Sequence, residues 1–245
     1  MFNKDYILQC NKYLTVYFFQ QLQKSEQIKQ TILNRGITES IINKFCLGYC
    51  SGDDNFLPFC EQKNISIDFL VHFGLITDSF TKRQVFKNRI MIPIPFYNQI
   101  VGFTARTTLT DPTISKYINS KANILFNKES MLYPIYNVYK FLAHDGCILV
   151  EGCFDVLTLL SQGIKNVIAV NGTNISKKQI RLISRWTDKA YICFDADETG
   201  INKAREMERK FLQSEFSTKI VKLPEGDPDE FVLKYGKQKF LDLLE

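Results

Sequence analysis

The sequence has few of the residues that build zinc sites. It contains two histidines, His72 and His144, far apart in the chain, and none of its seven cysteines forms a Cys-x-x-Cys pair. Structural zinc sites take four Cys or His ligands at short spacings, so we expect a protein without zinc. An odd number of scattered cysteines also argues against the disulfide framework of a secreted protein.

Three cysteines come closest to a zinc motif. Cys46, Cys50 and Cys60 would still need a fourth ligand, from Cys10 or His72. Residues four apart share one face of a helix. We therefore predict instead that Cys46 and Cys50 lie together on a helix of the core.

Long hydrophobic runs are also absent. No apolar stretch approaches the roughly 18 residues that a membrane-spanning helix requires, and the first six residues lack the cationic and apolar regions of a signal peptide. These absences predict a cytoplasmic protein with no membrane partner. A chain of 245 residues with 45% hydrophobic residues can bury a sizeable core, as one large domain or as two subdomains.

Acidic residues are scarce in one part of the chain. The net charge of the whole protein is +5, but between residues 81 and 130 eight basic residues stand against two acidic ones. The basic residues are Lys82, Arg83, Lys87, Arg89, Arg106, Lys116, Lys121 and Lys128. Clustered Lys and Arg attract polyphosphates, so we predict a binding function for them. The aromatic residues among them alternate with polar ones, which is typical of inward-facing residues of strands.

The apolar patterns predict two parts. Residues 1–80 favour helices, and residues 81–130 a basic β region in which Pro93 and Pro95 make one strand irregular or place it at an edge. Beyond residue 130, strands are expected at 147–150, 167–170, 190–194 and 219–223. Helices between them predict right-handed parallel crossovers. We expect an α/β protein, with a mixed α+β subdomain over 1–130 and a parallel-sheet domain over 131–245.

Carboxylates follow the ends of the predicted parallel strands. They form three groups: Glu151 and Asp155, Asp195 and Asp197, and Asp227 and Asp229. Ligands of open α/β sheets bind beyond the carboxyl ends of the strands, so these acids can converge. Carboxylates in one crevice raise each other's pKa unless a hard divalent cation neutralises them, which predicts Mg²⁺ or Mn²⁺. Each group also has a simpler interpretation as loop residues or, for Asp227 and Asp229, as a helix cap and first turn.

Four motifs in the second part carry a family resemblance. They are Ile148-Leu-Val-Glu-Gly-Cys-Phe-Asp-Val156, Asn171-Gly-Thr173, Phe194-Asp-Ala-Asp-Glu-Thr-Gly200 and Leu223-Pro-Glu-Gly-Asp-Pro-Asp-Glu230. Together they resemble the Toprim domain, which occurs in bacterial DnaG-type primases, topoisomerases, recombination proteins and some nucleases. This resemblance leaves the function open among those classes.

Motifs in the first part narrow the choice. They are Arg89-Ile-Met-Ile-Pro-Ile94, Val101-Gly-Phe-Thr-Ala-Arg106, Lys116-Tyr-Ile-Asn-Ser120 and Phe126-Asn-Lys128. In order and spacing they resemble the basic subdomain that precedes Toprim in DnaG-type primases. The resemblance covers roughly residues 13–235. It implies a DNA primase, a DNA-directed RNA polymerase that makes short RNA primers on single-stranded DNA during replication by two-metal nucleotidyl transfer.

The same resemblance implies roles for individual residues. Catalytic roles fall to Glu151, Asp195 and Asp197, and these three with Asp227 and Asp229 would hold Mg²⁺ or Mn²⁺. Supporting roles fall to Asp155, to Gly152 through a tight backbone turn, and to Gly172 and Thr173, which either offer amides to a phosphate or close a turn.

The resemblance also implies binding residues. Arg89, Arg106, Lys116, Asn119 and Lys128 match family positions that contact phosphates of the template or the nucleotide. Arginine suits bidentate phosphate contacts, and lysine suits point-charge contacts. The expected partners are therefore a single-stranded DNA template and nucleoside triphosphates.

The chain also departs from the family. It has no zinc module and no helicase-binding domain, so we expect a minimal core whose missing functions are absent or supplied by a replicative helicase of the primosome or a separate zinc-module protein. A composition rich in Lys, Asn, Ile and Phe led us to expect a phage or other mobile element. Two alternatives stay open: a Toprim nuclease, and a non-catalytic or partner-dependent module that binds single-stranded DNA.

Overall fold

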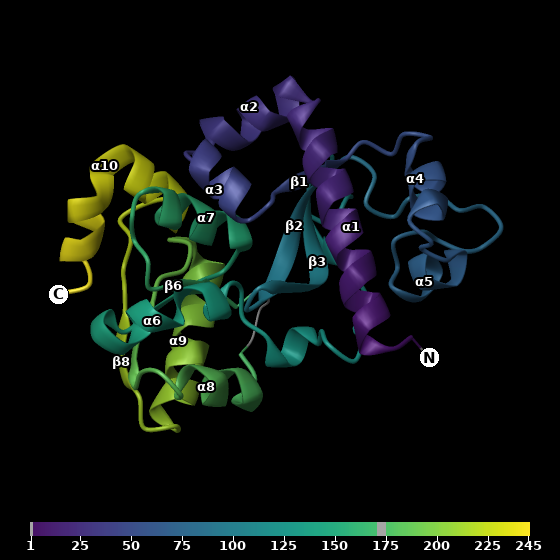
Figure 1. The fold of residues 1–245 in the computed structure, drawn as a ribbon. Coiled ribbons are helices and arrows are strands. Elements are labelled where there is room, and N and C mark those ends of the chain that lie inside the picture. The colour runs from purple at the N-terminus through teal and green to yellow at the C-terminus, as the bar shows by residue number, and fades with distance from the viewer. Residues whose placement is uncertain (1, 171–174) are drawn as a thin grey trace. The chain divides into compact units, whose positions relative to one another are not determined.

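The computed structural model describes residues 2–170 and 175–245 (Figure 1). Its backbone contacts divide it into two compact units: Met1–Leu33 with Ile42–Asn127, and Asn34–Ile41 with Lys128–Glu245. The second unit thus includes a short segment from the early part of the chain. Of the helices in the described ranges, none is long and apolar enough to cross a membrane.

The first unit packs helices around an antiparallel sheet. Its elements are α1 (Lys4–Gln23), α2 (Glu26–Asn34), β1 (Gly48–Cys50), α4 (Phe56–Gln62), α5 (Ile67–His72), β2 (Arg89–Phe96), β3 (Gln99–Thr107) and β4 (Tyr117–Asn119), while α3 (Glu39–Lys44) spans the boundary with the second unit. The sheet order is β1-β2-β3-β4. Apolar residues of α1, such as Leu14 and Phe18, share a core with Met91 and Phe103 of the sheet. The predicted inward orientation of the aromatic residues is confirmed for Phe86, Phe103 and Phe126, which are buried, but it was wrong for Tyr97, which is 52% exposed in the turn between β2 and β3.

Strand β2 accommodates its prolines where pairing is incomplete. Strand β1 pairs with β2 only from Arg89 to Met91, so Pro93 and Pro95 lie beyond it. The register against β3 also shifts between Ile94 and Pro95. The predicted irregularity is confirmed, because proline is tolerated where no amide has to donate to a ladder.

Cys46 and Cys50 do not share a helix, so that prediction was wrong. Helix α3 ends at Lys44, and Cys46 follows it with a φ of 50°. Cys50 is the last residue of β1. The left-handed backbone at Cys46 ends the helical register and leads the chain into the sheet.

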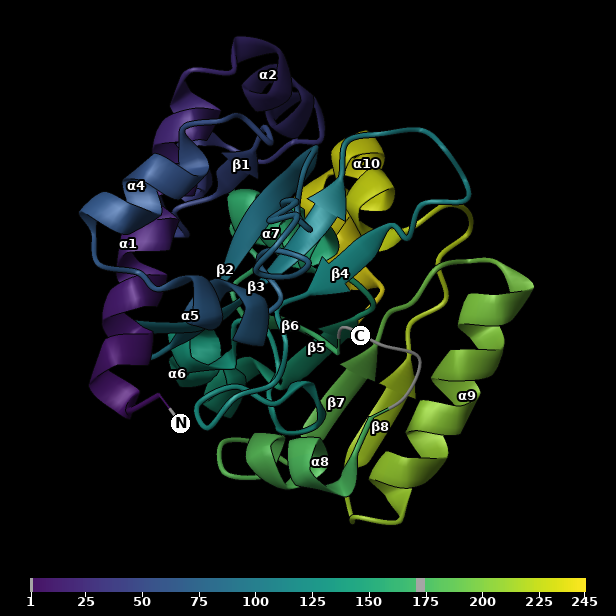
Figure 2. The ribbon, with the colours of Figure 1, turned by 90° about the vertical axis from the view of Figure 1, so that its right-hand side faces the viewer.

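The second unit is a parallel α/β structure. Its elements are η1 (Lys128–Ser130), α6 (Ile135–Asp145), β5 (Cys147–Val150), α7 (Cys153–Ser161), β6 (Val167–Ala169), α8 (Lys177–Ile183), β7 (Lys189–Ile192), α9 (Glu198–Leu212), β8 (Ser217–Ile220) and α10 (Pro228–Asp242). The sheet order is β6-β5-β7-β8, with every pair parallel. Figure 2 shows β7 and β8 side by side with α9 along them. The expected α/β fold class is confirmed.

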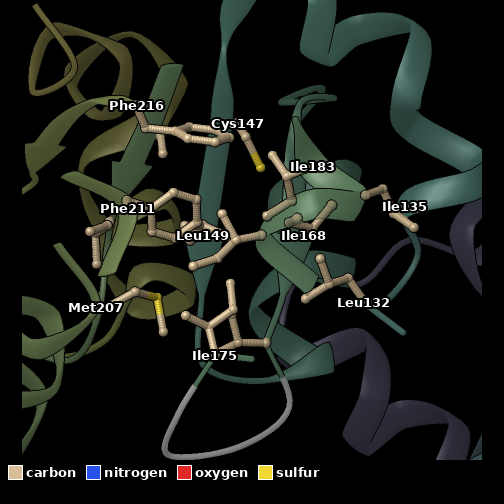
Figure 3. Packing of buried hydrophobic residues seen from close by; sticks show 14 of the residues in the cluster. Leu132, Ile135, Cys147, Leu149, Ile168, Ile175, Ile183, Met207, Phe211 and Phe216 are labelled. Atoms are coloured by element: carbon tan, nitrogen blue, oxygen red, sulfur yellow. The ribbon is translucent and has the colours of Figure 1, made fainter. Parts of the chain in front are cut away.

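The core of this unit buries strands β5 and β6 of its sheet. All four residues of β5 are buried, and Leu149 and Ile168 pack with Ile183 of α8 and with Met207 and Phe211 of α9 (Figure 3). A parallel sheet covered on both faces reads as continuous apolar strands, which is why these strands could be predicted. Polar chemistry is therefore placed in the loops that follow the strands.

Candidate functional site

Three carboxylates of the second unit converge. One oxygen from each of Asp155, Asp227 and Asp229 lies within 4.8 Å of the others. Asp155 is on the first turn of α7, and its Oδ2 accepts a hydrogen bond from the Gly152 amide at 2.9 Å. Asp227 caps α10, since its Oδ1 accepts from the Glu230 amide at 2.9 Å. The helix-cap interpretation of Asp227 is thus right, and it is compatible with the cluster.

The cluster has too little positive charge for its carboxylates. Burial, with the nearby charge of Asp229, raises the pKa of Asp155 to about 8. Burial and the adjacent carboxyl group of Asp227 also raise the pKa of Asp229, although Arg35 acts in the opposite direction. A hard divalent cation takes carboxylate oxygens as ligands and would relieve this repulsion.

Asp229 is held by a residue from the early part of the chain. The carboxylate is 2% exposed, and Arg35 forms an ion pair with its Oδ2. Its other oxygen, Oδ1, is buried and has no hydrogen-bond partner among the described residues. A buried carboxylate oxygen without a partner costs about 1–3 kcal/mol, so this atom is suited to a ligand.

Backbone geometry fixes the segment that carries Arg35. Thr158 of α7 donates to the Arg35 carbonyl at 3.0 Å. Gly36 has a φ of +75°, and a Cβ on it would lie 2.3 Å from Cδ2 of Leu233 in α10. The left-handed backbone favours glycine here, and any side chain would also have to displace Leu233.

Glu151 is a second carboxylate that is held by a basic side chain, as Asp229 is held by Arg35. Its Oε2 accepts a hydrogen bond from Nζ of Lys203, on α9, at 2.6 Å. Its Oε1 is buried without a hydrogen-bond partner in the described part of the chain. Glu151 directly precedes Gly152, whose amide donates to Asp155, so one short segment carries Glu151 and a hydrogen-bond donor to the three-carboxylate cluster.

Asp195 and Asp197 follow β7. Asp195 is close enough to add to the raised pKa of Asp155, and it lines a hollow of about 290 Å³ between α9 and β8. Asp197 caps α9, with Oδ1 accepting from the Gly200 amide at 2.6 Å. A Cβ on Gly200 would lie 2.2 Å from the Asp195 carbonyl oxygen, so glycine allows this turn to close.

The structure therefore groups the predicted residues differently from the sequence. Asp227 and Asp229 join the cluster, and so does Asp155, to which the sequence gave only a supporting role. Among the described residues, Glu151, Asp195 and Asp197 complete no group of three at that spacing.

Two further predictions concern glycines and a loop. The chain bends at Glu151 and Gly152, but Gly152 has a φ of −120°, an extended backbone that any residue adopts. The bend therefore does not require glycine, and the residue contributes its amide. Gly172 and Thr173 lie outside the described residues.

Most of the predicted basic residues belong to the first unit. In the register of the sheet, Arg106 pairs with Tyr117 and Thr104 with Asn119, which places Arg106 and Asn119 on one face. The guanidinium of Arg106 lies 5.8 Å from the Tyr117 ring centroid. Lys116 is exposed.

The other two basic residues differ in surroundings. Arg89 is 7% exposed, and its Nη1 donates to the Ser115 carbonyl at 2.9 Å. Burial lowers the pKa of its guanidinium. Lys128 is exposed and begins η1 in the second unit. Arg89 thus supports the loop before β4, whereas Lys128 presents its charge to solvent.

Two residues at the site were missed from sequence. The predicted site residues included neither Arg35 nor Lys203. Arg35 lies 194 residues from Asp229, and Lys203 lies 52 residues from Glu151. For Arg35, the one available signal was the Arg35-Gly36 pair itself, which lies between two helices.

Comparison with protein families gives two matches. Residues 17–139 match the family described as DNA primase catalytic core, N-terminal domain, and residues 148–232 match the Toprim-like family. The two matches lie on either side of the start of β5.

Curated relatives are DNA primases. The DNA primase of Clostridium acetobutylicum is 34% identical over 245 residues, which cover 98% of this chain and 41% of the relative. That of Aquifex aeolicus is 32% identical over 232 residues, covering 93% of this chain and 46% of the relative. The chain therefore spans less than half the length of these relatives.

Solved structures agree. The Aquifex aeolicus primase with its zinc-binding and RNA polymerase domains superposes with a TM-score of 0.91 at 29% identity, covering 99% of this chain and 61% of that one. A DnaG primase catalytic domain bound to single-stranded DNA gives 0.84 at 28% identity, covering 98% and 81%.

Proposed function

Since this chain belongs to the DNA primase catalytic core family, we propose that it copies single-stranded DNA into short RNA primers by nucleotidyl transfer. The observation that carries the proposal is the group of Asp155, Asp227 and Asp229, two of them buried and one half-buried, at the starts of helices α7 and α10. Nucleotidyl transfer needs such a group, because the reacting phosphates bring negative charge that must be neutralised.

The cluster fits a divalent cation of the Mg²⁺ or Mn²⁺ type. Its donors are carboxylate oxygens, which hard cations prefer, and Oδ1 of Asp229 is buried without a partner among the described residues. None of the seven cysteines forms a disulfide and six of them are buried, which favours oxygen over sulfur ligands. When bound, the cation would stabilise charge on the transferred phosphoryl group.

Residues around the cluster take complementary roles in the proposal. Glu151 offers Oε1 as a proton acceptor or a further ligand, since Oε2 is occupied by Lys203. Asp195 and Asp197 add negative charge beyond β7, and the cap hydrogen bond to Gly200 keeps Asp197 oriented.

The basic residues would bind the polyanions. Arg106 and Asn119 share one face of the antiparallel sheet, and with exposed Lys116 they offer donors to phosphates of the template or nucleotide. Lys128 would add a point charge, and Arg89 would order the adjoining loop through Ser115. The template and nucleoside triphosphates are the partners in this proposal.

Further partners follow from the relatives. The Aquifex aeolicus structure contains a zinc-binding domain beside its RNA polymerase domain. We therefore include a zinc-module protein and a replicative helicase as partners that would supply template selection and recruitment to this chain.

Primer synthesis on single-stranded DNA tests the proposal. Labelled nucleotides and Mg²⁺ or Mn²⁺ should give oligonucleotides with the wild type and none with Glu151→Gln or Asp155→Asn. Glu206→Gln is the matched control, because Glu206 is an exposed acid of α9 paired with Lys210. Template cleavage, or template binding without incorporation under every metal condition, would contradict the proposal.

A further inference from the structure

Lys203 brings a positive charge against an acidic residue of the site. Its Nζ lies 2.6 Å from Oε2 of Glu151, and the two side chains are only 24% and 22% exposed. Partly buried ion pairs are screened less by salt than exposed ones. The ion pair therefore holds the Glu151 side chain in one position, unlike a transient ion pair on the surface.

The pairing divides the carboxylate into two unequal oxygens. An ionised carboxylate accepts hydrogen bonds at both oxygens, but Lys203 takes only Oε2, and Oε1 is left buried without a partner in the described part of the chain. The arrangement matches that of Asp229, where Arg35 holds Oδ2 and Oδ1 has no partner there. In both cases a cation of the protein orients a carboxylate and leaves one oxygen for a ligand.

A lysine placed here also has an electrostatic effect. An ammonium group repels a divalent cation bound to neighbouring carboxylates, and at partly buried sites this repulsion is stronger than in water. Lys203 should therefore weaken cation binding while it orders Glu151. A residue with only a structural role would not have this double effect.

We propose that Lys203 is a positioning residue: it holds Glu151 through Oε2 and lowers the affinity of the neighbouring carboxylates for divalent cations. The first part rests on the proposed function, because it concerns the orientation of Glu151 for primer synthesis. The second part concerns cation binding alone and can be measured without turnover.

The test compares Lys203→Met with Lys210→Met. Both variants remove one positive charge from α9, but Lys210 pairs with the exposed Glu206 at 3.0 Å. Mn²⁺ binding, followed by its paramagnetic resonance signal, should tighten by about threefold or more in Lys203→Met and stay unchanged in Lys210→Met. Primer synthesis at saturating Mn²⁺ should fall by about 10-fold or more in Lys203→Met alone.

Lys203→Arg separates position from charge. An arginine keeps the positive charge and can reach the same carboxylate, so Mn²⁺ affinity should stay close to that of the wild type and part of the synthesis should return. If Lys203→Met does not fold, Lys203→Gln replaces it as the variant without the charge, and Lys203→Arg stays the variant that keeps it.

Mn²⁺ binding that is unchanged or weaker in folded Lys203→Met would overturn the electrostatic part, and undiminished synthesis at saturating Mn²⁺ would overturn the positioning part. If the wild type bound Mn²⁺ but made no primers, the proposed function would fail together with the positioning part. The Mn²⁺ titration would still decide the electrostatic part.

Discussion

The paired carboxylates of the second unit and the exposed cations of the first unit are held in opposite ways. Asp229 is 2% exposed and ion-paired with Arg35, and Glu151 is clamped by Lys203. Lys116, by contrast, is exposed in the loop directly before β4. Buried, paired groups keep a fixed geometry, as chemistry requires, whereas exposed cations keep their rotamer freedom and suit a polyanion of variable shape. The two kinds of residue should therefore fail differently when changed.

The largest effect should come from Asp229→Asn. The substitution keeps the shape but removes the charge that Arg35 and the other carboxylates are arranged around. We expect about 100-fold slower primer synthesis, measured at saturating template. Asp188→Asn, at an exposed position of the same unit, should be near wild type, and a similar loss there would remove the distinction between buried and exposed acids.

The next largest effect should come from Gly36→Ala, which should lower the free energy of unfolding. A methyl group would meet Leu233 at 2.3 Å and would sit at a φ of +75°, which together should cost about 2–4 kcal/mol in urea unfolding. Gly163→Ala is the matched control: its φ is +77°, but a Cβ would approach only Nζ of Lys237, at 3.3 Å. About 1–2 kcal/mol is expected there, and equal losses at both glycines would show that packing against α10 does not matter.

The buried Asp155 should make the stability of the metal-free protein depend on pH, which an exposed carboxylate would not do. The pKa of Asp155 is raised from 3.8 to about 8 in the folded protein, so metal-free stability should fall as pH rises from 3.8 towards 8, where the buried group must ionise. Asp155→Asn should flatten this dependence and raise the metal-free Tm at pH 8 by at least about 2–4 °C. Mg²⁺ should stabilise the wild type more at pH 8 than at pH 6, because it binds the ionised form. A Tm that rises with pH without metal would contradict this.

The smallest effects should come from the basic residues. Arg106→Ala combined with Lys116→Ala should weaken single-stranded DNA binding by about 10-fold and reduce the salt slope by about 0.7 for each lost phosphate contact. Fluorescence anisotropy at several salt concentrations would measure both. Lys12→Ala, at an exposed position of α1, should change neither, and unchanged binding in the double variant would exclude this face from the template path.

The fold was largely predictable because its signals are local. The apolar runs now seen as β5 and β7 are buried parallel strands, and the family resemblance is confirmed by the matches over 17–139 and 148–232. The error at Cys46 and Cys50 came from reading a spacing of four as a helix across a chain turn.

The sequence predicted which acidic residues belong to the site, but not how they group or which basic residues pair with them. Strand ends identified the acids, but only the three-dimensional positions of α7 and α10 bring Asp155 beside Asp227 and Asp229. Arg35 and Lys203 could not be assigned, because nothing in a sequence pattern reveals which distant carboxylate a single cation will meet. The individual catalytic and phosphate-binding roles remain predictions.

The reach of Arg35 to Asp229 has a consequence for how the protein assembles. The two residues are 194 positions apart, so during synthesis the arginine leaves the ribosome long before its partner exists. Contacts of such long sequence separation form late, because closing the loop costs entropy first. Asp229 therefore obtains its counter-charge only once α10 has been made, and a nascent chain can build most of its parallel sheet before it acquires a finished acidic centre.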